Sequence, residues 1–360
     1  MKNINNFYSD TTIKIIPYQW EEGVMGRMLR FETNTLPYPP KSLLVFVEEL
    51  KKKCPINEYF DSNYTRLKKL IAQYEGVKTD MVTVTNSGDE AIDILAKAFF
   101  NPGDYFVTTP PTYEMFDIQC SINRGINLPV ALKPITWDVD AEKIIKKSQN
   151  PKVKLIFSVN PNNPTASIIP EKILEKIISK SAAIVVVDEV YREFYGKSAN
   201  KFLSKYKNLV ILRSLSKFAA MAGARIGYLI ANPEFSQKFN AIRFPMGVSY
   251  FSYKLTEFVL EKDQMWIKKQ VEMIKKERTR LINEISIFGF YVYPSYANFL
   301  LVKIGKRATE ICQKLKRKGI IIRDRSQKKY LAGCVRITIR SQEENNQLIK
   351  ALEDIIYEKD

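Results

Sequence analysis

The residues best suited to chemistry lie between positions 183 and 225. Lys217 ends the segment 213–217, which carries two serines, and Arg225 follows eight residues later. Upstream, an apolar run ends at Asp188, and Tyr191 lies three residues beyond it. A lysine amine can form a Schiff base, serine hydroxyls and an arginine can hold a phosphate, and an acid can pair with a ring nitrogen. Pyridoxal phosphate requires these groups, so the ordered set predicts a site for that cofactor.

Each of these residues also has an ordinary structural explanation. Asp188 could cap a helix or a turn, and Tyr191 could be one packed side chain among 19 tyrosines. Lys217 alone would be weak evidence in a lysine-rich chain. Ser214 and Lys217 also match the Ser-x-x-Lys element of penicillin-binding enzymes, but the Ser-Asp-Asn and Lys-Thr-Gly elements of that class are absent from the sequence. The inference therefore depends on the order of the whole set.

Two further segments fit a ligand that carries a phosphate. Ser87-Gly88-Asp89 opens a predicted helix after a predicted strand, and backbone amides at a helix N-terminus bind phosphate. Asp89 could equally be a plain capping residue. The segment 160–165 follows an apolar run, and its two prolines predict a sharp turn that permits a cis peptide bond. Within it, the Asn163 side chain could donate to a ligand oxygen.

The elements that must position these residues alternate between strands and helices. Apolar, β-branched runs at 153–159 and 183–187 predict central strands that are buried on both faces. We therefore expect an α/β fold with a mainly parallel central sheet. Beyond residue 245, the charged stretch 252–285 predicts helices with a break near Asp263. The domains we expect are an N-terminal arm at 1–39, a large domain at 40–245 and a smaller C-terminal α/β domain at 246–360.

Composition narrows the possible functions. An ordinary balance of 45% hydrophobic and 26% charged residues, with no apolar stretch of membrane-spanning length, predicts a cytoplasmic protein without membrane partners. The four cysteines are scattered, which predicts reduced thiols and no metal site. Histidine is absent, which excludes Ser-His-Asp and Cys-His catalysis. The net charge of +17 could indicate nucleic-acid binding, but the basic residues are interleaved with acids, so we expect a solvated basic surface and no nucleic acid.

The order of the motifs resembles that of the fold-type I pyridoxal-phosphate enzymes, and most of all that of the histidinol-phosphate aminotransferases. The resemblance covers nearly the whole chain. It implies a large domain with a mainly parallel central sheet, a smaller C-terminal α/β domain, and pyridoxal 5'-phosphate as the cofactor. The motifs that carry it are Ser87-Gly88-Asp89, Tyr113, Asn163-Pro164, Asp188-x-x-Tyr191, Ser214-x-x-Lys217 and Arg225.

The resemblance implies a role for each of these residues. Lys217 would bind the cofactor as a Schiff base and shuttle the substrate proton, while Asp188 would pair with the ring nitrogen. Asn163 and Tyr191 would contact the phenolic oxygen, and Tyr113 would stack on the ring. The remaining cofactor contacts, mostly to the phosphate, would come from Ser87, Gly88, Asp89, Ser214, Ser216 and Arg225.

The resemblance also implies contacts to a partner subunit and to the substrate. Tyr59 matches a tyrosine that these enzymes contribute to the neighbouring subunit's phosphate site, so we expect a homodimer. Arg336 would bind the carboxylate of the amino donor, and Asn163 would also border the substrate. Arg323, with Tyr18, would lie near the distal phosphate of the substrate.

Two of the departures from the family pattern involve single residues of the site segments. Ala166 follows Asn163-Pro164-Thr165 where the family usually has glycine, a mild change in a cofactor loop. Arg340 stands in a substrate-facing segment where histidinol-phosphate aminotransferases commonly carry glycine.

The resemblance leaves three functions to compare. The leading one is an aminotransferase that moves nitrogen between L-glutamate and 2-oxoglutarate on one side and a small phosphorylated ketone or aldehyde on the other. The alternative is a decarboxylase of an O-phosphorylated amino acid, similar to threonine-phosphate decarboxylase, because that family shares the scaffold. A pyridoxal-binding regulator without turnover fits least, since such regulators append a DNA-binding domain.

Overall fold

The computed structural model describes residues 8–15, 18 and 28–357. Its larger sheet has seven strands in the order β2-β8-β7-β6-β5-β3-β4. Strand β8 is antiparallel to both neighbours, and the other strands run parallel to one another, so the expected mainly parallel sheet is confirmed. The strands are β2 (Val82–Asn86), β3 (Tyr105–Val107), β4 (Ile126–Asn127), β5 (Val153–Val159), β6 (Ile184–Asp188), β7 (Leu209–Ser214) and β8 (Ile226–Ala231).

The central strands are buried on both faces because helices cover both sides of the sheet. Successive side chains of a strand point to opposite faces, so Val185 and Val187 enter one core cluster and Val186 enters another. The Val186 cluster includes α4 (Ser87–Phe99), α5 (Met115–Ile122) and α10 (Pro233–Ile242). The opposite cluster includes α3 (Thr65–Glu75), α6 (Ala141–Ser148), α7 (Glu171–Lys180) and α11 (Tyr250–Lys262).

A second sheet has five strands in the order β1-β11-β12-β10-β9. Strand β1 is parallel to β11, and the remaining pairs are antiparallel. The strands are β1 (Leu29–Phe31), β9 (Tyr291–Val292), β10 (Phe299–Lys303), β11 (Ile320–Asp324) and β12 (Cys334–Thr338). The N-terminal segment thus forms an edge of a sheet whose other strands come from the C-terminal third of the chain.

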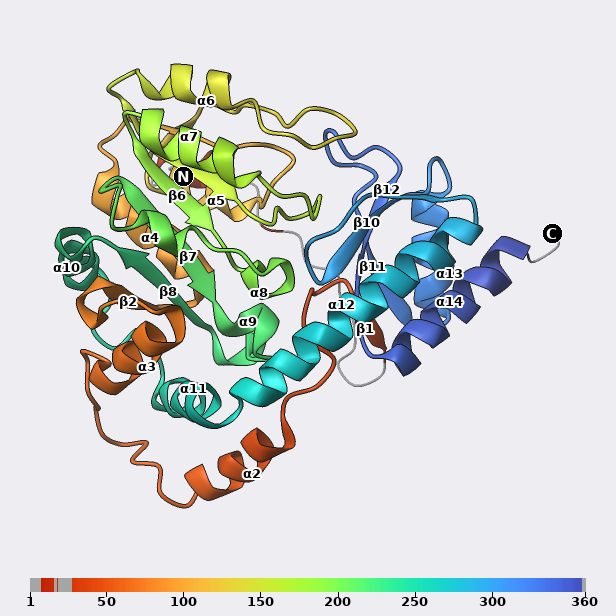
Figure 1. Ribbon diagram of the computed structural model, residues 1–360, viewed down its shortest axis with the longest axis horizontal. Coiled ribbons are helices and arrows are strands. Elements are labelled where there is room, and N and C mark those ends of the chain that lie inside the picture. The colour runs from red at the N-terminus through yellow and green to blue at the C-terminus, as the bar shows by residue number, and fades with distance from the viewer. Residues whose placement is uncertain (1–7, 16–17, 19–27, 358–360) are drawn as a thin grey trace, which may run out of the picture.

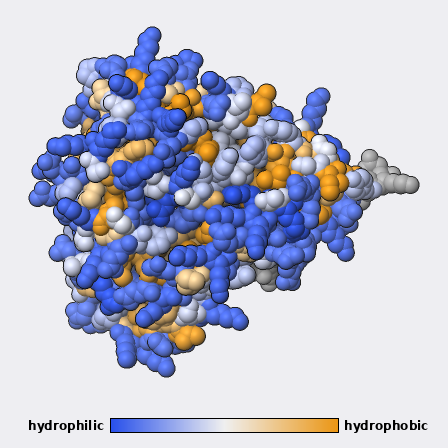
Figure 2. All heavy atoms as spheres, viewed as in Figure 1, coloured by the Kyte–Doolittle hydropathy of each residue, from blue (hydrophilic) through white to orange (hydrophobic). Residues whose placement is uncertain are grey.

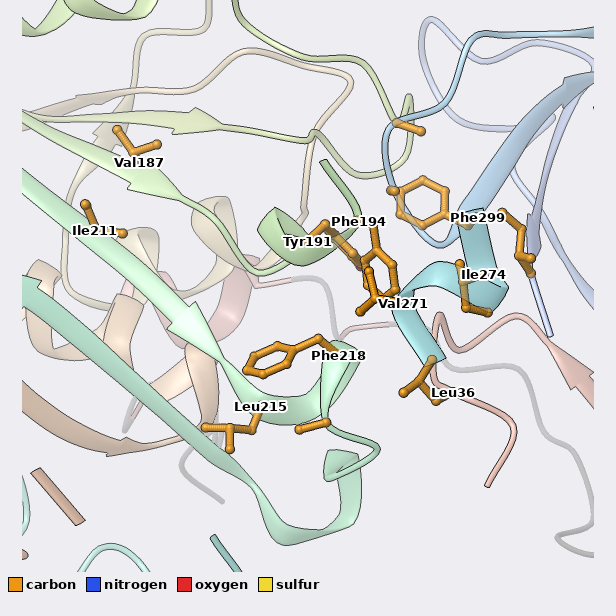
Figure 3. Close-up of a cluster of buried hydrophobic side chains, with 14 of the residues drawn as sticks. Leu36, Val187, Tyr191, Phe194, Ile211, Leu215, Phe218, Val271, Ile274 and Phe299 are labelled. Carbon is orange, nitrogen blue, oxygen red and sulfur yellow. The ribbon is translucent and has the colours of Figure 1, made fainter. Parts of the chain in front are cut away.

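The helix α12 (Gln264–Ile287) runs from the larger sheet to the smaller one (Figure 1). Asp263 separates it from α11, as the sequence predicts, and accepts a hydrogen bond from Ser42 at 2.6 Å. Side chains from both sheets and from α12 form one continuous core cluster (Figure 3). The helices not yet named are α1 (Asp10–Lys14), α2 (Lys41–Leu50), α8 (Arg192–Tyr195), α9 (Leu215–Phe218), α13 (Ala308–Arg317) and α14 (Gln342–Tyr357).

We retain as a proposal the division of the chain into an arm, a large domain and a small domain. Among the residues described, no helix is both long and apolar enough to cross a bilayer. The same residues contain no group of three or more His, Cys, Asp or Glu side chains placed to hold a metal ion.

Candidate functional site

A cavity of about 880 Å³ lies where the carboxyl ends of β5, β6 and β7 meet the first turn of α4. Parallel α/β sheets bind their ligands at this edge, and the volume suits a cofactor with a small substrate. The structure brings thirteen of the predicted site residues to its wall: Tyr18, Ser87, Gly88, Asp89, Tyr113, Asn163, Asp188, Tyr191, Ser214, Ser216, Lys217, Arg225 and Arg336.

Two predicted site residues do not line the cavity of this single chain. Tyr59 is 90% exposed. Arg323 is buried and lies opposite Arg336 in the pairing of β11 with β12, outside the cavity wall. A role for Tyr59 therefore needs a second subunit, whereas Arg323 shares a face of the smaller sheet with Arg336 and so lies next to the cavity wall.

Lys217 lies in the single turn of α9, directly after β7. Its Nζ donates to the backbone oxygen of Thr33 at 2.8 Å. Burial lowers the pKa of the Lys217 amine to about 7, and the positive charge of Arg336 acts in the same direction. A substantial fraction of the amine is therefore neutral near pH 7, which is the form that attacks a carbonyl carbon.

Asp188 is the last residue of β6, and its side chain is buried. Burial raises the pKa of the carboxyl to about 7, although a hydrogen bond from the Val190 amide at 3.0 Å and the charge of Arg213 oppose the rise. A cationic group beside Asp188 would offset the cost of burying its charge. The position fits a protonated ring nitrogen.

Asn163 and Tyr191 approach the cavity from the loop after β5 and the turn before α8. The Asn163 Oδ1 accepts a hydrogen bond from Arg336 at 2.7 Å, and the Tyr191 hydroxyl accepts one from Asn34 at 3.0 Å. The peptide bond between Asn163 and Pro164 is cis, as the sequence permits. Burial raises the pKa of Tyr191 to about 12, so its hydroxyl keeps its proton at neutral pH.

The first turn of α4 forms the opposite end of the cavity. Ser87 has a positive φ of 74°, and β8 passes so close that a side chain at Gly227 would meet the Ser87 carbonyl and lie 2.7 Å from the Gly88 nitrogen. Only glycine permits this approach. The first-turn amides of a thirteen-residue helix carry partial positive charge and so fit a phosphate.

Polar side chains complete this end of the cavity. The hydroxyls of Ser214 and Ser216 lie 2.9 Å apart, and the guanidinium of Arg225 pairs with Asp89 at 2.8 Å. The Tyr113 hydroxyl donates to the other Asp89 oxygen at 2.9 Å. Two hydroxyls, a guanidinium and the helix amides are a donor set typical of a phosphate site.

Sequence reasoning missed the segment 30–37, which supplies much of the remaining wall. Thr33 meets Lys217 and Asn34 meets Tyr191, as described above, and Arg336 donates to the Glu32 backbone oxygen. The available signal was a short polar run after Leu29-Arg30-Phe31, which alone indicates no particular site.

Arg340 also lines the cavity, but its guanidinium has protein partners. It donates to the backbone oxygen of Arg30 at 3.1 Å and pairs with Glu344 at 2.7 Å. These contacts tie the segment 30–37 to α14.

Comparison with known proteins gives a consistent result. The family model for aminotransferase class I and II matches residues 27–352. The chain is 35% identical over 351 residues to a histidinol-phosphate aminotransferase from Thermoanaerobacter pseudethanolicus, covering 97% of this chain and 96% of the relative. It is also similar to the crystal structure of the histidinol-phosphate aminotransferase from Clostridium acetobutylicum, with a TM-score of 0.82 and 28% identity over 91% of this chain and 99% of that one. The Sinorhizobium meliloti enzyme in complex with pyridoxal-5'-phosphate has the same fold, with a TM-score of 0.86 and 23% identity over 97% of each chain.

Proposed function

Because the chain belongs to the class I and II aminotransferase family and is a pyridoxal-phosphate-dependent aminotransferase, we propose that it moves an amino group between L-glutamate and a small phosphorylated ketone or aldehyde of the histidinol-phosphate type. The substrate class is supported by relatives of that name that match nearly the full length of the chain. The observation that carries the proposal is the single cavity that joins Lys217 and Asp188 to an arginine-lined wall.

The residues around the cavity fit the cofactor. We assign Lys217 to its carbonyl carbon, Asp188 to the ring nitrogen, Asn163 and Tyr191 to the phenolic oxygen, and Tyr113 to the ring face. When bound, pyridoxal phosphate supplies an electron sink that stabilises negative charge on a substrate carbon. For the phosphate we assign Ser87, Gly88, Asp89, Ser214, Ser216 and Arg225, which share the end of the cavity formed by α4 and β7.

Lys217 is also the residue we assign to proton transfer. The sequence contains no histidine, and a group whose pKa lies near the working pH is the most effective general base. The Lys217 pKa of about 7 meets that condition. Its Nζ therefore accepts and returns the substrate proton in this proposal.

Arg336 is the residue we assign to the carboxylate of L-glutamate. Its guanidinium lines the cavity and is buried with Asn163, so a carboxylate there would be bound without competition from bulk water. For the distal phosphate of the second substrate we propose Tyr18, which lines the cavity, and Arg323, which lies opposite Arg336 on the same face of the smaller sheet.

We further propose that the enzyme is a homodimer. Tyr59 is almost fully exposed, and α2 also exposes Leu44 and Val45, by 55% and 61%. Figure 2 shows apolar side chains among hydrophilic ones at the lower end of the molecule, where Figure 1 places α2. A second subunit that covers this surface would receive Tyr59 near its own phosphate site.

A cytoplasmic, biosynthetic role completes the proposal. The four cysteines are free thiols, as expected of a protein in a reducing compartment. L-Glutamate and 2-oxoglutarate are metabolites of that compartment.

The amino-donor half-reaction tests the proposed function directly. Adding L-glutamate to the purified holoenzyme should replace the visible absorption band of the cofactor by the near-ultraviolet band of its aminated form, with one equivalent of 2-oxoglutarate released. Histidinol phosphate and other phosphorylated amines should produce the same change. A holoenzyme that leaves glutamate unchanged but releases carbon dioxide from O-phospho-L-threonine would instead be a decarboxylase.

A further inference from the structure

Asn34 lies at the centre of a buried hydrogen-bond network in the wall of the cavity. It is 1% exposed and has a φ of 54°, in the left-handed region. Its backbone amide donates to Thr338 Oγ1 at 2.9 Å, and its backbone oxygen accepts from Asn298 at 3.0 Å. Its side-chain amide donates to Tyr191 at 3.0 Å. A sparsely populated backbone conformation held by three separate partners is over-determined by its surroundings.

The donors in this network can be assigned one after another. The Asn34 backbone amide can only donate, so Thr338 Oγ1 accepts from it. The hydroxyl proton of Thr338 is then directed to Asn34 Oδ1 at 3.2 Å. With Oδ1 accepting there, the NH₂ group of Asn34 faces the Tyr191 hydroxyl. An NH₂ group only donates, so the Tyr191 oxygen accepts and its own proton remains for the cavity.

The ring of Tyr191 is held so that this proton has a defined direction. The ring packs edge-on against Phe299, with centroids 5.1 Å apart and planes at 75°. Figure 3 shows Tyr191 beside Phe194, Val271 and Phe299, where the two sheets meet. Burial keeps the hydroxyl protonated at neutral pH. Tyr191 therefore stays a donor over the working range of pH.

Asn163, which we also assign to the phenolic oxygen, presents a hydrogen-bond donor to the cavity as Tyr191 does. Arg336 can only donate, so the Asn163 Oδ1 accepts from it and leaves the NH₂ group for the cavity. Two donors at one place favour a ligand oxygen that only accepts, and an ionised hydroxyl meets this condition whereas a protonated one does not.

From these contacts we propose that Asn34 is a positioning residue that orients the Tyr191 hydroxyl as a hydrogen-bond donor toward the ionised phenolic oxygen of the cofactor. The proposal rests on the proposed placement of the cofactor and is independent of the second substrate. Reversing the Asn34 side-chain amide would instead draw the Tyr191 proton away from the cavity.

The test is a pH titration of the visible absorption band of the Lys217-bound cofactor in the holoenzyme, with no substrate present. A donor to the ionised oxygen stabilises the chromophore form with full negative charge there, so loss of the donor raises the apparent pKa of the chromophore. Tyr191→Phe should raise the apparent pKa of the chromophore by about one pH unit. Asn34→Asp should raise it similarly, because the introduced carboxylate only accepts and captures the Tyr191 proton.

The negative charge introduced by Asn34→Asp is separated from its effect on Tyr191 by a double mutant. In a Tyr191→Phe background, Asn34→Asp should change the apparent pKa by much less than it does alone. Equal changes in both backgrounds, or no change in either, would overturn the proposal.

A second pair of variants avoids new charge in the core. Thr338→Val removes the hydroxyl that fixes the Asn34 amide, so it should move the titration in the same direction as Tyr191→Phe, whereas Thr338→Ser should leave it in place. A Thr338→Val enzyme that titrates like wild type would contradict the proposed network. Absence of a visible band in the wild-type protein would instead contradict the assignment of Lys217 to the cofactor.

Discussion

At the scale of single residues, Lys217 combines a buried position with a reactive protonation state. Its amine has a pKa of about 7 because of burial and of the charge of Arg336, and the Thr33 carbonyl holds it in the cavity. An exposed lysine would be almost fully protonated at neutral pH and unable to attack a carbonyl carbon.

The rate of cofactor binding to the apoprotein should therefore depend on pH. The second-order rate at which the visible band forms should rise as pH increases through about 7, because the neutral amine reacts. Arg336→Gln removes a nearby positive charge, so it should move this rise to higher pH. Stopped-flow absorbance measures both, and Lys217→Ala is the control that should form no band and support no turnover. An unchanged midpoint in Arg336→Gln would exclude the proposed influence of Arg336.

The site residues that sequence could predict are those that lie in local motifs. The motifs of Lys217 with its serines, and of Asp188 with Tyr191, can be recognised from a few consecutive residues. The structure places all of these residues on the cavity wall. Thr33 and Asn34 could not be found this way, because their partners lie more than 150 residues away. Arg323 shows the opposite limit, since the motif gave its place on β11, opposite Arg336, but not whether it would reach the cavity wall.

At the scale of elements, a buried ion cluster joins α3 to the strands that carry the site. Glu75, at the end of α3, pairs with Arg192 of α8 at 2.6 Å and with Arg213 of β7 at 3.1 Å, and it accepts from Tyr228 of β8 at 2.5 Å. Arg213 also donates to the Glu189 backbone oxygen, next to Asp188. Burial alone would raise the pKa of Glu75, but Arg213 and Arg192 lower it to about 2.

Removing the central cation should destabilise the protein strongly. Arg213→Met leaves Glu75 buried with fewer positive partners and should lower the free energy of unfolding by about 3–5 kcal/mol at pH 7. In wild type, the Glu75 contribution is present above pH 4.5 and is lost as pH falls toward 2, so the difference between wild type and variant should shrink over that window. Urea denaturation followed by circular dichroism measures the free energy of unfolding of both proteins at each pH.

The matched control is an arginine in an exposed ion pair. Arg66→Met breaks the surface pair with Glu261 at 2.6 Å and a longer contact of 3.9 Å with Glu257, which keeps its pair with Lys254, so it should cost less than about 1 kcal/mol. Equal losses of unfolding free energy in Arg213→Met and Arg66→Met would show that the buried cluster stabilises the protein no more than a surface ion pair does.

The elements that sequence predicted well are the long ones. The apolar run 153–159 became β5 with the same bounds, because central strands buried on both faces need continuous apolar residues. The strands β1 and β9 have three and two residues, too few for a periodic signal. The position of β1 follows from its pairing with β11, which is a tertiary contact and has no local signature.

At the scale of the whole molecule, the proposed dimer makes each cavity depend on two chains. Tyr59→Ala should weaken cofactor affinity, and hybrid dimers offer a direct check. If a Tyr59→Ala subunit is paired with a Lys217→Ala subunit, one of the two cavities combines an intact Lys217 with an intact Tyr59. Such hybrids should recover wild-type cofactor affinity in half of their sites, measured by fluorescence titration.

Two results would count against this arrangement. Analytical ultracentrifugation that finds a monomer with normal cofactor affinity would exclude the shared site. Hybrids that bind the cofactor no better than the Tyr59→Ala homodimer would show that Tyr59 acts within its own chain.

The segment 30–37 also has a consequence for synthesis of the protein. The backbone amide of Asn34 bonds to Thr338, and the Glu32 carbonyl bonds to Arg336, each across 304 residues. At about 5–20 residues per second, the ribosome needs roughly 15 to 60 s after making this segment to make its partners. The wall of the cavity is therefore completed only after residue 338 has been made, so a nascent chain that ends before that residue cannot assemble a competent site.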